Sequence, residues 1–240
     1  MLRGVAHRYR LAMKRIWGRA VEQNEENIAR ALAARGPLKS LLDLGCDDGA
    51  HTMLWAEAAG AQAVHGIEVV PARASLARER GISVTTADLG GPLPFEDQTF
   101  DAVVSNQVIE HLFDTDLFLA EAFRVLRPGG VVVTSTENLA SWHNIASLLL
   151  GWQPFSLSNV SMTGPIGNPL GLAAASPPLP DAVTWQHHRV FATRGLLDLH
   201  RAHGFTAIEC YGAGYYPLPG NLGRLNSAHA AFITVVGQRV

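Results

Sequence analysis

Residues 41–52 read LLDLGCDDGAHT, which is a short apolar run, a loop with two glycines and the beginning of a helical pattern. A strand that runs into a glycine-bearing loop and then into a helix is where open α/β sheets bind nucleotides. Gly45 and Gly49 let the backbone turn tightly and approach a ligand closely, where a Cβ atom would clash. The stretch therefore predicts the first strand, loop and helix of a nucleotide-binding α/β fold.

The sequence around this stretch alternates between short apolar runs and segments of helical spacing, a pattern typical of βαβ units and a parallel sheet. The expected helices cover residues 52–59, 71–80, 116–126 and 193–203, and the expected strands cover residues 40–44, 63–68, 83–87, 101–106, 130–135, 206–212 and 230–236. We therefore predict an α/β fold: a Rossmann-like, doubly wound, seven-stranded and mostly parallel sheet with an N-terminal helical extension and a cap insertion.

The N-terminal segment is more basic than the rest of the chain. Residues 1–39 hold nine of the nineteen Lys and Arg residues but only three of the twenty-one Asp and Glu residues. Tyr9, Met13, Ile16 and Trp17 recur at helical spacing among these cations, which predicts an amphipathic helix with a basic face. A second helical stretch is expected to end at the Gly36-Pro37 breaker. We expect the first helix to cover the ligand site as a lid, and we favour this role over contact with an anionic membrane surface.

Residues 139–190 interrupt the alternation. They contain one acidic residue, one basic residue, three of the five tryptophans and six of the thirteen prolines. A long insertion of this kind inside a domain is typical of a functional lid. We therefore divide the chain into an extension, residues 1–38, and a domain, residues 39–240, in which residues 139–190 form a cap. The side chains expected to wall off an apolar pocket are Trp142, Trp152, Phe155, Trp185 and Phe191, and those expected to hold polar groups there are Asn144, Asn159 and Asn168.

The composition excludes several classes of protein. Hydrophobic residues make up 48% of the 240 residues and charged residues 17%, which supplies a core and excludes global disorder. A net charge of −2 argues against a dedicated nucleic-acid binder. The chain has two cysteines, Cys46 and Cys210, and no apolar run of the ~20 residues that cross a bilayer, so we expect a cytoplasmic protein.

Polar side chains follow three further expected strands. Glu68 ends the second strand, where an acid can accept hydrogen bonds from the two hydroxyls of a ribose. Asp88 and Leu89 follow the third strand, where an acid can meet the amino group of an adenine and a leucine can pack on its ring. Asn106 ends the fourth strand. Together these groups predict a ligand that contains adenosine.

Five motifs resemble those of one known family. They are LDLGCDDG (42–49), GIE (66–68), ADL (87–89), FDAVVSNQVIEHL (100–112) and LRPGG (126–130). Across residues 41–137 they resemble the class I S-adenosylmethionine-dependent methyltransferases, of the broad group that includes the quinone-biosynthesis methyltransferases. The resemblance implies an enzyme with S-adenosyl-L-methionine as its cofactor. One departure is Asp47, which stands where a glycine is common in the middle of the first loop.

The same resemblance implies roles for individual residues. The loop from Asp43 to Gly49 would hold the methionine part of the cofactor, Glu68 would hold its ribose, and the Asn106 region would line the methionine end. The full implied set of cofactor-binding residues is Asp43, Gly45, Cys46, Asp47, Gly49, Glu68, Val69, Asp88, Leu89 and Asn106.

Two other functions fit parts of the pattern. A nicotinamide-dependent oxidoreductase needs glycines spaced G-x-G-x-x-G, whereas Asp47 takes the second glycine position here and the loop follows D-x-G-x-x-x-G. A domain that binds the cofactor without transferring its methyl group, as a regulatory or scaffold subunit, is the other alternative. The nearly intact motifs favour the enzyme over both.

Methyl transfer from a sulfonium is an in-line displacement, so the protein mainly aligns the reactants and excludes water. A hydroxyl acceptor also needs a general base, and His111, His143 and His187 are the candidates, since the pKa of histidine lies near neutrality. Some quinone-pathway relatives hold a divalent metal with an acid three residues before a Glu-His pair. Here Gln107 stands at that position before Glu110, so we expect no metal.

The sequence therefore predicts O-methyl transfer to a hydroxyl of a small molecule, a sugar or a lipid-linked acceptor, with a histidine as the general base. It indicates no nucleic-acid partner and no particular oligomeric state.

Overall fold

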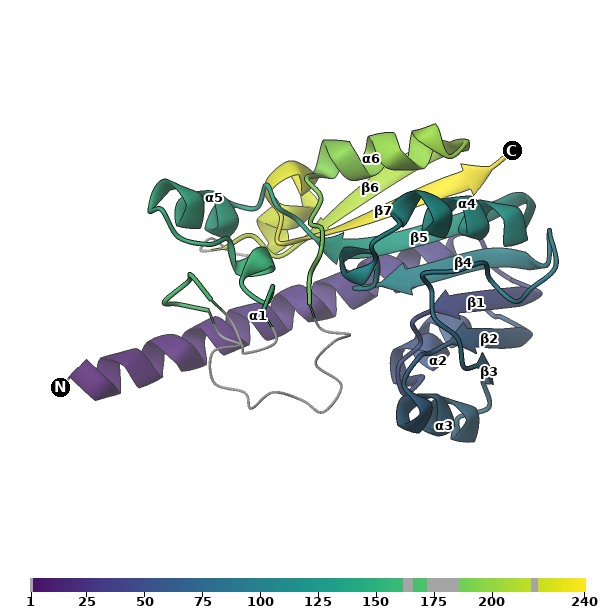
Figure 1. Cartoon of the computed structure of the whole chain (residues 1–240), viewed down its shortest axis with the longest axis horizontal. Coiled ribbons are helices and arrows are strands. Elements are labelled where there is room, and N and C mark those ends of the chain that lie inside the picture. The colour runs from purple at the N-terminus through teal and green to yellow at the C-terminus, as the bar shows by residue number, and fades with distance from the viewer. Residues whose placement is uncertain (1, 162–165, 172–185, 217–219) are drawn as a thin grey trace.

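Seven strands form one sheet at the centre of the molecule, in the order β3-β2-β1-β4-β5-β7-β6 (Figure 1). The strands are β1 (Ser40–Leu44), β2 (Ala63–Ile67), β3 (Ser83–Thr85), β4 (Phe100–Asn106), β5 (Leu126–Glu137), β6 (Phe205–Ala213) and β7 (Phe232–Arg239). The neighbours from β3 to β5 pair in parallel, and β7 runs antiparallel to both β5 and β6. This confirms the predicted seven-stranded, mostly parallel sheet.

The computed structural model describes residues 2–161, 166–171, 186–216 and 220–240, and it describes residues 2–12 and 221 by their backbone alone. The helices are α1 (Leu2–Ala33), α2 (Ala50–Ala58), α3 (Pro71–Glu79), α4 (Thr115–Val125), α5 (Trp142–Leu149) and α6 (Thr193–Ala202), with short 3-10 turns η1 (Ile109–His111), η2 (Phe155–Leu157), η5 (Gly220–Arg224) and η6 (Ser227–His229). Over the described part of the chain, we find no helix with the length and apolar character needed to cross a membrane.

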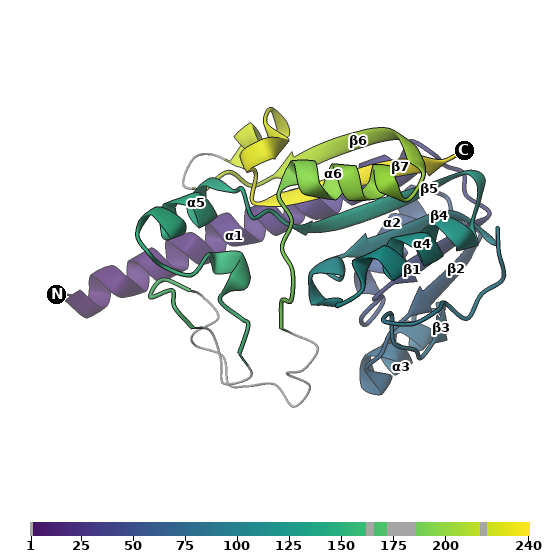
Figure 2. The same cartoon turned by 45° about the horizontal axis from the view of Figure 1, so that its top comes forward.

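Helices cover both faces of the sheet, with α4 and α6 on one face and α1 and α2 on the other (Figure 2). Neighbouring residues of a strand point to opposite faces. In β1, Leu42 packs into the core under α4 and α6, while Leu41 packs into the core under α1 and α2. Because both faces are buried, the strands read as continuous apolar runs rather than as alternating ones, as is usual for parallel sheets.

The N-terminal segment differs from its prediction in two ways. First, the two helical stretches that we predicted are one continuous helix, α1, which includes Gly18. Trp17 packs on the rings of Tyr216 and Phe232, with ring centroids 6.2 and 4.9 Å away, and Ile16 joins the same cluster. For Ile16 and Trp17, the prediction of a lid over the ligand site is therefore wrong, whereas the side chain of Tyr9 lies outside the described part of the structure.

A buried amide holds α1 to the sheet. The Asn24 side chain is 2% exposed, and its Oδ1 accepts hydrogen bonds from the Ser135 hydroxyl at 2.7 Å and the Thr234 hydroxyl at 3.1 Å. Its Nδ2 donates to Asn106 Oδ1 at 2.9 Å. The one side chain therefore links α1 to β4, β5 and β7.

We expect Asn24→Ala to lower the free energy of unfolding by about 2–3 kcal/mol, because two buried hydroxyls and an amide lose their partner. Urea denaturation measures the change. The control is Glu22→Ala, an exposed residue on the same helix, which is expected to change stability by less than about 0.5 kcal/mol. Equal effects of the two substitutions would show that the Asn24 network does not hold the helix in place.

Candidate functional site

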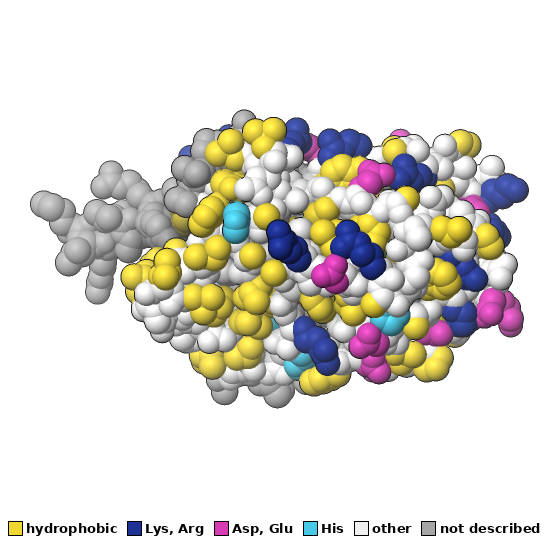
Figure 3. Space-filling model, turned by 90° about the horizontal axis from the view of Figure 1, so that it is seen from above, with side chains coloured by type: hydrophobic (Ala, Val, Ile, Leu, Met, Phe, Trp, Pro, Cys, Tyr) yellow, Lys and Arg dark blue, Asp and Glu magenta, His cyan; other side chains and the backbone are white. Residues whose placement is uncertain are grey.

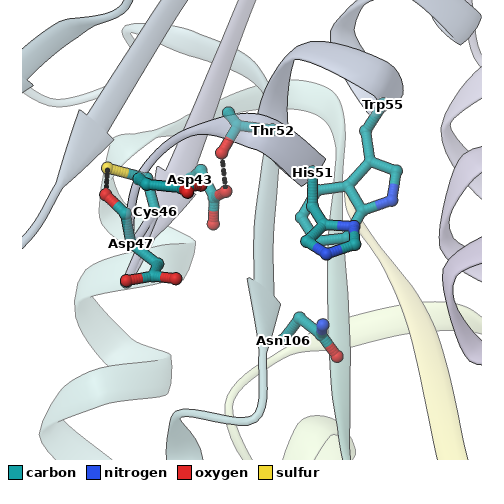
Figure 4. Close-up of a pocket in the computed structure, with 9 residues that line it drawn as sticks. Asp43, Cys46, Asp47, His51, Thr52, Trp55 and Asn106 are labelled. Carbon is teal, nitrogen blue, oxygen red and sulfur yellow. Dashed lines mark hydrogen bonds between the residues drawn. The ribbon is translucent and has the colours of Figure 1, made fainter. Parts of the chain in front are cut away.

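A pocket opens at the carboxyl ends of β1 and β4, with a cavity volume of about 160 Å³. Its lining residues are Asp43, Gly45, Cys46, Asp47, Asp48, His51, Thr52, Trp55 and Asn106. Asp43, Cys46, Asp47 and Thr52 lie on one side of the close-up in Figure 4, and His51, Trp55 and Asn106 lie on the other. Five of the ten predicted cofactor-binding residues thus meet in one place: Asp43, Gly45, Cys46, Asp47 and Asn106.

The loop after β1 turns by means of left-handed backbone. Gly45, Asp47 and Gly49 have φ angles of 89°, 48° and 80°. A Cβ atom on Gly45 would lie 2.5 Å from Cγ2 of Val108, so this position admits only glycine without a shift of its neighbour. Aspartate tolerates the left-handed region better than most residues do. The geometry explains why a glycine is common at position 47 and how Asp47 can replace it.

Asp47 has a partner that offsets its charge. Nε and Nη2 of Arg73 donate to its two carboxylate oxygens. Both side chains are substantially exposed, so we attribute little stability to the pair.

Asp43 is a buried acid at the centre of the site. The Thr52 hydroxyl donates to its Oδ2 at 2.6 Å, while its Oδ1 has no hydrogen-bond partner among the described residues. Burial, together with the charges of Glu25, Glu68 and Asp47, raises the pKa of Asp43 to about 7. No lysine or arginine belongs to the residues that line the pocket. The site therefore suits a cationic ligand that also donates hydrogen bonds.

Glu68 lies directly after β2 and fixes the loop. Its carboxylate accepts hydrogen bonds from the backbone N–H groups of Asp47 at 3.0 Å and Val70 at 2.8 Å. Each carboxylate oxygen has more than one acceptor position, so both can still accept from a ligand. Val69 beside it is 46% exposed.

The remaining predicted cofactor residues do not line the cavity. Gly49 is the N-cap of α2, and Asp88 accepts a hydrogen bond from the backbone N–H of Gly90 at 2.9 Å. Leu89 is 8% exposed and belongs to the core under α4 and α6. Glu68, Val69, Asp88 and Leu89 therefore remain predictions for the adenosine end of the ligand.

His51, Thr52 and Trp55 line the pocket from the first turns of α2, although the sequence did not single them out as cofactor residues. Their position directly after the glycine loop is a signal that could have identified them. Nor did the sequence single out Glu25 of α1, which accepts a hydrogen bond from Nδ2 of Asn106 at 3.0 Å. No local sequence pattern connects these two residues.

Two of the three candidate histidines meet. The ring centroids of His111 and His187 lie 4.7 Å apart. Nδ1 of His111 lies 3.0 Å from the Gln186 carbonyl oxygen, and Nδ1 of His187 lies 2.6 Å from the Ser156 carbonyl oxygen. A ring nitrogen that contacts a carbonyl carries the proton, so the Nε2 atoms of both rings carry the free lone pairs.

His143 lies in a different environment. Its ring packs against Phe155 and Tyr216, with centroids 5.5 and 5.0 Å away, and burial lowers its pKa to about 4. His188, next to His187, stacks on Phe113 at 3.8 Å. The structure therefore brings His111 and His187 together, and it places His143 among aromatic side chains.

A completely buried carboxyl group adjoins the histidine pair. One potential ligand atom each from Glu110, His111 and His187 lies within 4.8 Å of the others, which is a grouping that could hold a metal ion. Burial, together with the charge of Glu137, raises the pKa of Glu110 to about 8. Burial lowers the pKa of His111 to about 4 and also lowers the pKa of His187. At neutral pH the grouping consists of two neutral imidazoles and a carboxylic acid, and the absence of a metal stays a prediction.

The cap side chains do not all face one pocket. Trp142 is 41% exposed and packs against His229, while Phe191 packs against the core under α4 and α6. The amides of Asn144 and Asn168 bond within the cap, to Ser156 Oγ at 2.8 Å and to the Gln153 carbonyl at 2.8 Å. The roles of these four side chains around a bound molecule therefore stay predictions, and Trp185 lies outside the described residues.

The end of the molecule that carries α5 has an apolar surface. Leu148, Leu149 and Leu150 are 55%, 82% and 61% exposed. In the view from above, hydrophobic side chains gather toward this end, and most charged side chains lie toward the other (Figure 3).

The sequence and the fold of this chain are similar to those of known proteins. Residues 42–134, from β1 to within β5, match the family model described as a methyltransferase domain. This is the segment that carries the glycine loop, Glu68 and Asn106. Residues 42–134 form a methyltransferase domain.

Individual relatives agree with this assignment. A probable S-adenosylmethionine-dependent methyltransferase of Mycolicibacterium smegmatis is 37% identical over 130 residues, which are 53% of this chain and 48% of the relative. A ubiquinone biosynthesis O-methyltransferase of Agrobacterium fabrum is 30% identical over 122 residues, 47% of each protein. The chain thus spans about half the length of these relatives. The crystal structure of a methyltransferase from Thermotoga maritima shares the fold, with a TM-score of 0.60, 19% identity and 96% coverage of both chains.

The buried Glu110 makes stability depend on pH. In the unfolded chain it ionises near its ordinary pKa of 4.5, whereas in the folded protein burial raises the pKa to about 8. Between these values only the folded state keeps the proton, so this group lowers the free energy of unfolding by about 1.4 kcal/mol for each pH unit of increase. The loss is complete above the folded pKa.

We expect Glu110→Gln to remove this slope. Urea denaturation at several pH values is expected to show the variant gaining stability relative to the natural protein as the pH rises from 5 toward 8 (a range set by the two pKa values). Glu57→Gln, at an exposed position of α2, serves as the control. A difference that does not vary with pH would contradict a protonated Glu110.

Proposed function

We propose that this protein binds S-adenosyl-L-methionine and transfers its methyl group to a hydroxyl of a small-molecule, sugar or lipid-linked acceptor, with a histidine as the general base. The observation that carries the proposal is the pocket at the ends of β1 and β4. There, left-handed backbone at Gly45 and Asp47 adjoins the buried carboxyl of Asp43, and the lining offers no cation. This donor set fits a cofactor that bears a sulfonium and an ammonium group, and it lacks the lysine of phosphate-binding loops.

Different residues of the chain would bind different parts of the cofactor. Asp43 and the loop to Gly49 would hold the methionine part, with Asn106 at the opposite wall, and Glu68 would accept hydrogen bonds from the ribose hydroxyls. Asp88 and Leu89 would contact the adenine. When bound, the cofactor supplies an activated methyl group.

We expect Glu68→Ala to weaken the binding of S-adenosylhomocysteine by about 1.5–3 kcal/mol, the usual contribution of hydrogen bonds to a charged group. Isothermal titration calorimetry measures the affinity, and circular dichroism checks that the variant is folded. Glu57→Ala is the matched control, because Glu57 is an exposed glutamate of α2. Unchanged affinity in a folded Glu68 variant would overturn the ribose assignment.

In this proposal, the histidine pair takes the proton of the acceptor. His111 follows β4. Nδ1 of His187 lies 3.9 Å from Oε2 of Glu137, the last residue of β5. β4 and β5 pair in parallel, so the pair lies at the same edge of the sheet as Asn106 of the pocket. We therefore assign the base to this pair, whose free Nε2 atoms can take a proton, rather than to His143.

Two observations support an acceptor that is methylated on oxygen and linked to a lipid. The Agrobacterium relative is named an O-methyltransferase, which favours an oxygen acceptor. The exposed leucines at the end of α5 give the cap an apolar surface, which favours a lipid-linked acceptor among the three classes.

We expect His111→Asn and His187→Asn each to lower kcat, with the larger loss, about 10²–10⁴-fold, at the residue that acts as the base. The assay follows transfer of a labelled methyl group to a phenol, a hexose and a polyprenyl-phosphate sugar. His188→Asn is the control, since that ring stacks on Phe113. Binding of the cofactor with no labelled product from any acceptor would instead favour a non-catalytic binding domain.

The pH profile provides an independent check of the base. Burial lowers the pKa of His111 to about 4, below its ordinary value of 6.5. The base therefore stays neutral and active as the pH falls through 6, and kcat/KM is expected to decline only as the pH approaches that lower pKa. A decline centred at the ordinary pKa of histidine would argue against a buried base.

A further inference from the structure

Glu25 of α1 reaches the edge of the pocket from outside the matched domain. Its Oε1 accepts a hydrogen bond from Nδ2 of Asn106 at 3.0 Å, and its Oε2 lies 3.4 Å from Nδ1 of His51. Asn106 and His51 both line the pocket, on the side opposite the glycine loop (Figure 4). The side chain of Glu25 is 18% exposed, so its carboxylate lies among these residues and not on the open surface.

The carboxyl groups of Glu25 and Asp43 lie close enough for their charges to influence each other. Burial raises the pKa of Glu25, and the charge of Glu25 in turn raises the pKa of Asp43. The two arginines beside the glycine loop serve other groups: Arg73 pairs with Asp47, and Arg80 lies 3.7 Å from Asp48. His51, which is 58% exposed, is the one titratable partner of Glu25 among the described contacts. Asp43 thus lines the cavity, and Glu25 adjoins it through two residues of the opposite wall, His51 and Asn106.

The position of Glu25 is fixed by the helix that carries it. Its neighbour Asn24 is bonded to Ser135 and Thr234 of the sheet, and it also donates to Oδ1 of Asn106. Asn106 is therefore held through both ends of its amide by consecutive residues of α1. A carboxylate held this rigidly can recognise a ligand group at a defined position.

We propose that Glu25 binds the α-ammonium group of the cofactor's methionine part, opposite Asp43. This inference rests on the proposed function. An ammonium group carries three N–H donors and a positive charge, so it forms charge-assisted hydrogen bonds with a carboxylate. The sulfonium offers no donor, so the hydrogen-bonding capacity of Glu25 matches the ammonium group. The N-terminal helix thereby supplies part of the cofactor site.

The test compares two ligands that differ in the group that Glu25 would bind. S-adenosylhomocysteine carries the amino-acid portion, whereas 5′-methylthioadenosine retains the adenosine and the thioether but lacks it. We expect Glu25→Gln to weaken S-adenosylhomocysteine binding about 10- to 100-fold and to leave 5′-methylthioadenosine binding within about twofold. Glutamine keeps the acceptor for Asn106, and calorimetry measures both affinities. Glu22→Gln, on an exposed turn of the same helix, is expected to change neither affinity.

The outcomes separate this inference from the proposed function. Equal S-adenosylhomocysteine affinity in the natural protein and in Glu25→Gln would overturn the role of Glu25 while leaving the cofactor assignment intact. An equal loss for both ligands would also overturn it, because Glu25 would then act only by holding Asn106 in place. No binding of either ligand to the natural protein would overturn the proposed function itself.

Discussion

Parallel pairing of the strands is the constraint on which the rest of the molecule depends. Strands β3, β2, β1, β4 and β5 run in one direction, so each connection must cross a face of the sheet and cover it. Their carboxyl ends consequently share one edge. The acids and amides that follow β1, β2 and β4, and Glu137 at the end of β5, meet at that edge although they are far apart in the sequence. The pocket at the ends of β1 and β4 and the histidine pair lie at the same edge of the sheet for the same reason.

The features that could be predicted from the sequence are those that short-range patterns specify. Residues 41–52 contain a strand, a left-handed loop and the start of a helix in one uninterrupted stretch, and the structure has all three. The prediction of two helical stretches in the N-terminal segment was wrong, because α1 is one helix. Gly18 costs a helix only about 1 kcal/mol relative to alanine, and the packing of Trp17, Ala20 and Ile28 on either side of it offsets that loss.

The features that could not be predicted depend on contacts between distant residues. Glu25 meets Asn106, and His111 meets Gln186, over separations of 81 and 75 residues. No periodicity or motif connects such pairs, because the topology of the sheet alone brings them together. The asparagines of the cap illustrate the same limit. The sequence does not indicate which groups accept hydrogen bonds from the Asn144 amide. The fold shows that the Asn138 carbonyl and the Ser156 hydroxyl do so.

The packing of α1 changes the meaning of a domain boundary in this chain. Ile28 and Leu32 lie in the same core as Leu41, Val104 and Val131, and all five side chains are almost completely buried. A polypeptide that began at residue 39, close to the start of the family match, would present that face of the sheet to water as a continuous apolar strip. Such a surface favours self-association over solubility. The border between extension and domain is therefore visible in the charge of the sequence, whereas in the folded protein it runs through the middle of a hydrophobic core.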